Sequence, residues 1–120
     1  VANDFNLFQY SFTFKKKVKP WWIIPPEHIN YFNINSVQKI FHKNGFKTKD
    51  IKTSFPIDIF LLMGMDYISN KNLGKNAHTL RKKFEENLKT SGLEDLLISL
   101  QDNFTKLNIG RQIDLIVQKR

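Results

Sequence analysis

The sequence predicts an α+β fold that contains only two strands. Apolar residues recur at helical spacing between positions 77 and 107, whereas segments 46–55 and 110–117 carry residues that suit a pleated surface. Residues 1–32 show neither period for long. Because a two-stranded sheet is only marginally stable by itself, the sequence also predicts that both strands need a partner surface outside this chain.

The composition is that of a globular protein. The chain has 120 residues, 41% of them hydrophobic and 25% charged, which is enough for a single domain or a fragment with one core. The absence of cysteine excludes a disulfide framework, a thiolate metal site and a cysteine nucleophile. It agrees with a cytoplasmic location.

The sequence lacks targeting and membrane signals. No segment reaches the roughly 18 consecutive apolar residues of a membrane span, and the first residues do not resemble a signal peptide. We therefore expect no membrane partner. The chain begins with Val1 instead of methionine, which indicates a processed product or a fragment of a longer protein.

The net charge of +8 raises the question of an anionic partner. Only Lys15–Lys17 with Lys19 form a run, and the other lysines are spread along the chain, so a solvated surface is the favoured interpretation. The alternative is a nucleic-acid binder that uses this run, with Tyr10, Phe12 and Phe14 as stacking groups. We regard nucleic acid as the less favoured partner.

Residues 1–32 are predicted to form a long ordered loop rich in aromatic residues. Gln9 to Phe14 alternate, which suggests a short strand or an extended segment. Pro20, Pro25 and Pro26 keep the following residues out of helix and sheet interiors. Loops of this length in small domains are often functional.

Residues 33–56 are predicted to form a helix and a strand. Asn33 suits the N-cap of a helix whose apolar face carries Val37, Ile40 and Phe41, and Gly45 suits a left-handed stop. Phe46 to Phe55 then reads as a strand that ends before Pro56.

Residues 57–109 are predicted to form a helical insertion. Ile57 to Met65 reads as a buried helix or a lid, and Asn70 to Asn76 reads as a turn. A helix follows from Ala77, with Leu80, Phe84 and Leu88 on one face, and Ser91–Gly92 end it. Ser91 and Glu94 have the spacing of a capping box for the last helix. Residues 110–120 form the final strand.

Several short stretches together resemble a known enzyme family. They are Asn3–Asn6 with Gln9, Trp21–Trp22, Pro25–Phe32, Gly45–Phe46, Ser54–Asp58 and Gly110–Val117. In this order they resemble the C-terminal part of bacterial class I S-adenosylmethionine-dependent methyltransferases, in the branch often called type 12 or type 23. The resemblance spans nearly the whole chain, although the family has proline where this sequence has Ala2.

The resemblance implies a place in a larger sheet. The chain would supply the end of a Rossmann-like α/β methyltransferase fold, with two antiparallel edge strands and a helical insertion between them. The family's glycine-rich cofactor loop and its ribose-binding acidic residue belong to an N-terminal half that has no counterpart here, and all five glycines are isolated. The resemblance thus implies S-adenosylmethionine as the cofactor of the intact enzyme, and we expect none to bind this chain alone.

The resemblance also directs attention to particular residues. His28 is the candidate catalytic base, with a structural role in pinning the loop as the alternative. The candidate substrate-binding residues are Trp21, Trp22, Glu27, Asn30 and Tyr31. Asn3 and Asp4 are candidates for contact with the cofactor, since they follow the end of a strand. With three scattered histidines, no metal site is expected.

The resemblance implies methyl transfer as the function. A small-molecule or sugar acceptor is favoured over nucleic acid, because the insertion is apolar and not basic. The main alternative is a non-enzymatic interaction module, in which an exposed sheet edge and the aromatic loop bind a protein partner or a second copy of the chain.

Overall fold

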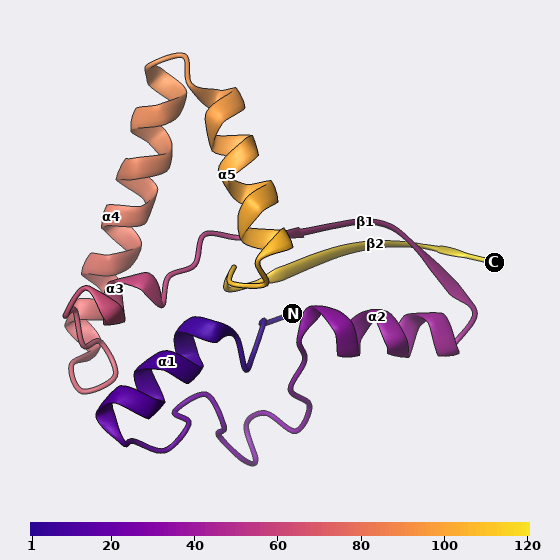
Figure 1. Ribbon diagram of the computed structural model, residues 1–120, viewed down its shortest axis with the longest axis horizontal. Coiled ribbons are helices and arrows are strands. Elements are labelled where there is room, and N and C mark those ends of the chain that lie inside the picture. Colours follow the sequence, from indigo (N-terminus) through magenta and orange to yellow (C-terminus); the bar gives the residue numbers. More distant parts are fainter.

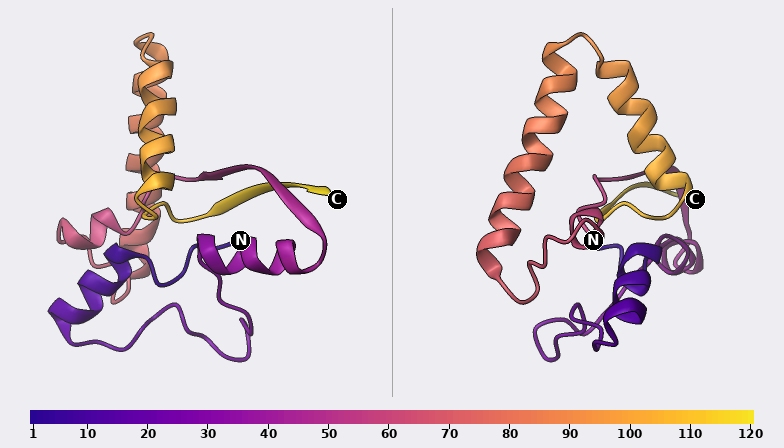
Figure 2. Two further views of the ribbon diagram at one scale, coloured as in Figure 1. Left: turned by 45° about the vertical axis from the view of Figure 1, so that its right-hand side comes forward. Right: turned by 60° about the vertical axis from the view of Figure 1, so that its left-hand side comes forward.

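A computed structural model describes residues 1–120 as five helices and two strands. Strands β1 (Phe46–Thr53) and β2 (Ile113–Lys119) form an antiparallel two-stranded sheet. Helix α2 (Ile34–Lys43) lies beside β1, and the hairpin of α4 (Lys71–Thr90) and α5 (Glu94–Lys106) extends away from one end of the sheet (Figures 1 and 2). Helices α1 (Leu7–Lys16) and α3 (Ile59–Leu62) contact each other near the base of α4. The predicted α+β class is therefore confirmed.

The sheet has a defined register with one irregularity. Thr53 pairs with Ile113, Ile51 with Leu115 and Phe46 with Lys119, and the register shifts between Thr48 and Asp50. The shift is typical of a β-bulge, which places one extra residue in one strand. Strand β1 ends at Thr53 and β2 begins at Ile113, each within three residues of the predicted bounds.

The first residues of the chain pair with the edge of β2 that faces away from β1. Val1 and Ile113 exchange two backbone hydrogen bonds, at 3.0 and 2.7 Å, and Ala2 forms an antiparallel bridge with Gln112. In contrast, the Gln112 carbonyl accepts from Ser54 N, which belongs to the β1 side. Residues 1 and 2 thus pair with the start of β2 on the edge opposite β1, in the position of a third strand.

The predicted loop over residues 1–32, with a short strand or extended segment at Gln9 to Phe14, is wrong for Leu7–Lys16, which form helix α1. The Asn6 side chain accepts from the backbone N–H groups of Phe8 and Gln9, both at 3.0 Å, and the Gln9 side chain accepts from Asn6 N. This reciprocal pair is a capping box with asparagine at the N-cap. The helix buries Gln9 and Phe12, which are three residues apart and so share a face. Residues 18–33 form the predicted irregular loop.

The prediction for α2 is confirmed at both ends. Asn33 caps it and accepts from Ser36 N at 2.9 Å, while Gly45 adopts a φ of +81° directly after it. Val37 is buried, and Phe41 packs edge-on against Phe46 at a ring distance of 5.8 Å.

Three predictions in the helical insertion are wrong in detail. The predicted helix or lid at 57–65 is only the four-residue α3, in which Leu61 is buried while the following Met63 is 70% exposed. The predicted turn at 70–76 is helical, because Asn70 caps α4 and accepts from Asn72 N. Ser91 does not cap α5, whose N-cap is Leu93 without a side-chain hydrogen bond.

The chain is extended and thin for its mass. Its radius of gyration is 15.7 Å and its accessible surface is 8470 Å². A monomeric domain of this size is expected to have a radius of gyration of about 13.6 Å and a surface of about 6,800 Å². The chain therefore exposes more surface than expected for its mass, and its exposed side chains include the large apolar residues Phe14, Ile29 and Met63.

Candidate functional site

A cavity of about 370 Å³ lies between the N-terminal segment, the aromatic loop and the turn before β2. We call it the loop cavity. Its lining comprises Val1, Ala2, Asp4, Trp21, Trp22, Ile24, His28, Asn30, Phe32 and Arg111. The volume lies within the range of small-molecule sites, which are mostly apolar with a few polar groups.

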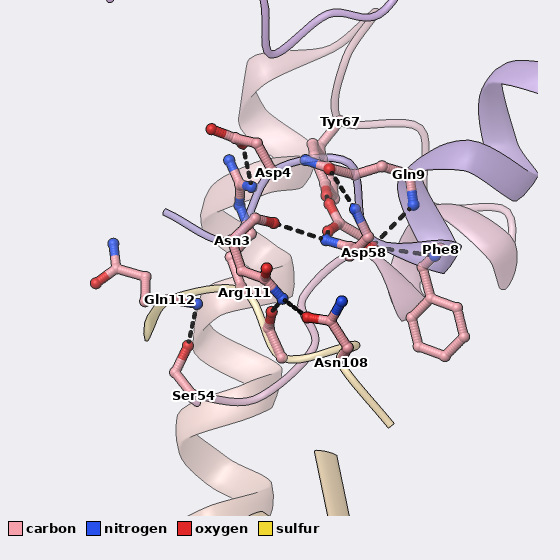
Figure 3. A network of polar contacts seen from close by, with 12 residues as sticks. Asn3, Asp4, Phe8, Gln9, Ser54, Asp58, Tyr67, Asn108, Arg111 and Gln112 are labelled. Carbon is pink, nitrogen blue, oxygen red and sulfur yellow. Dashed lines mark hydrogen bonds and ion pairs between the residues drawn. The ribbon is translucent and has the colours of Figure 1, made fainter. Parts of the chain in front are cut away.

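Backbone pairing fixes the N-terminal wall of the loop cavity. Asn3 is fully buried, and its side-chain amide donates to Asn108 Oδ1 at 3.1 Å and to the Gly110 carbonyl at 2.9 Å. The backbone N–H of Asp4 donates to the Phe32 carbonyl at 2.7 Å. The bonds of Asn3 tie the segment to the turn before β2 (Figure 3), and the bond of Asp4 ties it to the aromatic loop.

An ion pair forms the polar floor of the loop cavity. Asp4 is 6% exposed, and its Oδ1 accepts from Arg111 Nη1 at 3.2 Å (Figure 3). A buried carboxylate needs such a partner, since an uncompensated charge in the interior is costly. Asp4 therefore holds Arg111 beside the cavity, and Arg111 in turn makes the burial of Asp4 tolerable.

Aromatic rings form the apolar wall. Trp21 and Trp22 meet edge to face with ring centroids 4.8 Å apart, and Phe12 and Phe5 pack edge-on against Trp21 and Trp22, each at 5.5 Å. Edge-to-face pairs fix ring orientation as well as burying area. Trp22 is buried, yet its indole Nε1 has no hydrogen-bond partner in the protein. The wall therefore encloses one buried donor that has no partner.

The remaining candidates in the loop separate into two groups. His28 and Asn30 line the cavity, and the His28 imidazole makes no hydrogen bond to the protein, so the alternative role of pinning the loop through its ring is not seen. Tyr31 does not line the cavity. Its hydroxyl donates to the His28 carbonyl and accepts from Ile24 N, both at 2.9 Å, so it closes the loop on itself. Glu27 is exposed outside the cavity.

A buried polar cluster adjoins the N-terminal wall of the loop cavity, because the Asn6 side chain donates both to the Asn3 carbonyl and to Asp58. Asp58 is 1% exposed and accepts from Asn6 Nδ2 at 3.2 Å and from the Tyr67 hydroxyl at 2.7 Å (Figure 3). Burial raises the pKa of Tyr67 above its usual range, and the neighbouring Asp58 carboxylate raises it further. Asn6 also caps α1, so the cluster joins α1 to the segment around α3.

The structure thus places five of the eight predicted site residues around one cavity. Asp4, Trp21, Trp22, His28 and Asn30 converge there, whereas Asn3 lies behind the wall and Glu27 and Tyr31 lie outside. The lining also includes Phe32, one of the aromatic residues that the sequence suggested for an apolar pocket, whereas sequence reasoning missed Arg111. The one signal for Arg111 is its position after Gly110, where the last strand returns to the N-terminal segment.

Two further findings concern the whole chain. None of its helices combines the length and the apolar character that crossing a membrane requires. Side chains that bind metals do not gather in any group of three or more.

Comparisons with models of protein families, with curated proteins and with solved structures found no match to this chain.

Proposed function

We propose that the chain is the acceptor-side, C-terminal part of an S-adenosylmethionine-dependent methyltransferase that acts on a small molecule or a sugar. The observation that carries the proposal is the convergence of Asp4, His28, Asn30 and the two tryptophans on one cavity beside an unfilled sheet edge. These are residues through which the sequence resembles that family, and they come from distant parts of the chain.

The open edge of β2 supports the idea that the cofactor-binding half is a separate segment. In an antiparallel strand, the N–H and C=O groups of one residue point to one neighbouring strand, and those of the next residue point to the opposite side. Since Ile113 bonds to Val1, the N–H and C=O groups of Leu115, Val117 and Lys119 point to the same free edge. A strand there would extend the sheet.

The loop cavity suits an acceptor next to a sulfonium group. S-adenosylmethionine supplies a methyl carbon on positively charged sulfur, from which an oxygen or nitrogen of the acceptor displaces the sulfur in line. We assign to His28 the acceptance of the proton that this nucleophile loses, because the residue lines the cavity and histidine can act as a base near neutral pH. The faces of Trp21 and Trp22 favour a nearby positive charge.

Replacement of His28 in the complete enzyme tests the proposal. We expect His28→Ala to lower the rate of acceptor-dependent formation of S-adenosylhomocysteine by about 10²- to 10⁴-fold, the usual contribution of a general base. The matched control is Glu27→Ala, which alters the neighbouring exposed residue outside the cavity and is expected to change the rate less than about twofold. Equal rates for His28→Ala and the unaltered enzyme would remove His28 from the mechanism.

A second candidate function is a binding module without catalysis. It is favoured by the same free edge of β2 and by an accessible surface larger than expected for the mass, both of which suit the addition of a strand from a partner. The two functions differ in the loop cavity, since a module of this kind needs neither His28 nor the polar floor. A complete protein that forms no S-adenosylhomocysteine with any acceptor would favour the module.

A further inference from the structure

Arg111 joins the loop cavity to two further cavities. The middle cavity, of about 200 Å³, is lined by Trp21, Ile57, Asp58, Tyr67, Gly74, His78 and Arg111. The hairpin cavity, of about 270 Å³, is lined by Ser54, Phe55, Ile57, His78, Arg81, Arg111 and Gln112. Trp21 is shared by the first two and His78 by the last two, so the three cavities form a row along Arg111.

The hairpin cavity is rich in hydrogen-bond donors. A guanidinium has five N–H donors and no acceptor. Arg111 uses one of them on Asp4 and Arg81 uses one on Glu85, at 2.8 Å, which leaves four on each without a protein partner. His78 is exposed and has no hydrogen-bond partner for its ring. Ser54 and Gln112 add neutral polar groups.

The carboxylates of this region do not line the hairpin cavity. Asp4 lines the loop cavity and Asp58 lines the middle cavity, whereas no acidic side chain lines the hairpin cavity. Each arginine already has one carboxylate partner, so the formal charge is balanced and recognition would rest on directed hydrogen bonds. Arginine forks match the geometry of phosphate and carboxylate oxygens, which they bind in pairs.

We propose that the hairpin cavity binds a phosphate or carboxylate group through Arg81 and Arg111, with His78 as a third contact. Resting on the proposed function, this implies an anionic acceptor, whose reacting group lies in the loop cavity while its anionic group is held beside α4. The two arginines come from α4 and from the turn before β2, so the site would also join the helical hairpin to the sheet.

Titration with small anions tests the binding step without catalysis. The probes are inorganic phosphate and succinate, with glycerol as a neutral control and the ionic strength held constant with sodium chloride. Nuclear magnetic resonance follows the ring signals of the histidines. We expect phosphate or succinate to shift the signals of His78 and to leave those of His42, on α2, unchanged. Glycerol is expected to shift neither.

Matched variants on α4 locate the site. We expect Arg81→Gln to weaken anion binding at least tenfold, and Lys82→Gln, which removes the same charge from the next, exposed residue, to weaken it less than twofold. His78→Asn serves as a second variant that does not disturb the Arg81–Glu85 pair, with an expected loss of several-fold. Equal effects of Arg81→Gln and Lys82→Gln, or His78 signals that follow ionic strength alone, would overturn the proposal.

The outcome is separable from that of the proposed function. Anion binding that depends on Arg81 in a protein without methyl transfer would keep the site and reject the function. Methyl transfer to neutral acceptors, unaffected by Arg81→Gln, would do the reverse.

Discussion

The buried carboxylate of Asp58 shows how single residues hold this chain together. It lies among apolar neighbours in the sequence, between Ile57 and Ile59, where an unpartnered charge would be costly. The partners are Asn6, from 52 residues earlier, and Tyr67, from the segment after α3. No local pattern in the sequence identifies Asn6 as a partner, because this contact depends on the packing of α1 against α3.

We predict that Tyr67→Phe destabilises the chain by about 2 kcal/mol, because it removes a hydrogen bond to a buried charged group. Tyr10→Phe is the control, since Tyr10 is 67% exposed and its hydroxyl has no partner, and it is expected to change the free energy of unfolding by less than about 0.5 kcal/mol. Urea denaturation measures both. An equal loss in the two variants would show that the Tyr67–Asp58 bond does not stabilise the fold.

The same tyrosine gives a dependence of stability on alkaline pH. The pKa of Tyr67 is raised in the folded chain, whereas in the unfolded chain it has its ordinary value near 10. Below about pH 10 both states are protonated and the full stability is present. Above it the unfolded state releases a proton that the folded state keeps, so stability falls as pH rises. Tyr67→Phe is expected to lack this part of the alkaline loss.

At the scale of elements, one glycine sets the distance between the last turn and β1. A Cβ atom on Gly110 would lie 2.6 Å from the Ser54 carbonyl oxygen and would also meet the side chain of Thr53. Both are parts of the segment that pairs with β2, so they have little freedom to move. The Gly110 carbonyl also accepts a hydrogen bond from the Asn3 side chain, so the close packing of Gly110 against β1 affects the wall of the loop cavity.

We predict opposite effects for two glycine-to-alanine variants. Gly110→Ala is expected to destabilise the chain by about 3 kcal/mol, at the upper end of the usual loss from overpacking. Gly74→Ala is expected to stabilise it by about 0.5–1 kcal/mol, because Gly74 lies inside α4 and the nearest atom, Tyr67 Cβ, is at an ordinary 3.5 Å. Thermal unfolding of both variants measures the difference. A stable Gly110→Ala variant would show that the turn can move away from β1.

Local signals in the sequence predicted some elements and failed for others, for physical reasons. Asn33 and Gly45 mark α2 because capping and a positive φ are properties of single positions. Helix α1 was missed because alternating aromatic residues suggested a strand, although Asn6 and Gln9 form a capping box. The loop cavity was predicted in part, since its aromatic residues are adjacent in sequence. Arg111 reaches it only through the pairing of β2 with the N-terminal segment.

At the scale of the whole molecule, the surface and the sheet both fit the partner half that we propose. The accessible surface of 8470 Å² exceeds the roughly 6,800 Å² expected for this mass by about 1,700 Å². A standard interface buries about 800 Å² on each partner. The excess is therefore large enough for the cofactor-binding half that we propose, and the free edge of β2 is the place where hydrogen bonding would continue.

Hydrogen exchange tests this arrangement residue by residue. In the isolated chain we expect slow exchange at Asp114, Ile116 and Gln118, whose N–H groups face β1, and fast exchange at Leu115, Val117 and Lys119. When the chain is joined to the proposed half, the second set should become slow as well. Fast exchange at the second set in the complete protein would mean that no strand joins this edge.

Two proline variants separate the two edges of β2. Proline removes one N–H donor, and it is tolerated in a strand where that donor does not pair. Val117→Pro is therefore expected to leave the β1–β2 pairing of the isolated chain in place, whereas Ile116→Pro disrupts it. In the complete protein Val117→Pro should also destabilise, by about 3 kcal/mol or more. If Val117→Pro were harmless in both contexts, the free edge would have no partner strand and the proposed two-part enzyme would lose its structural basis.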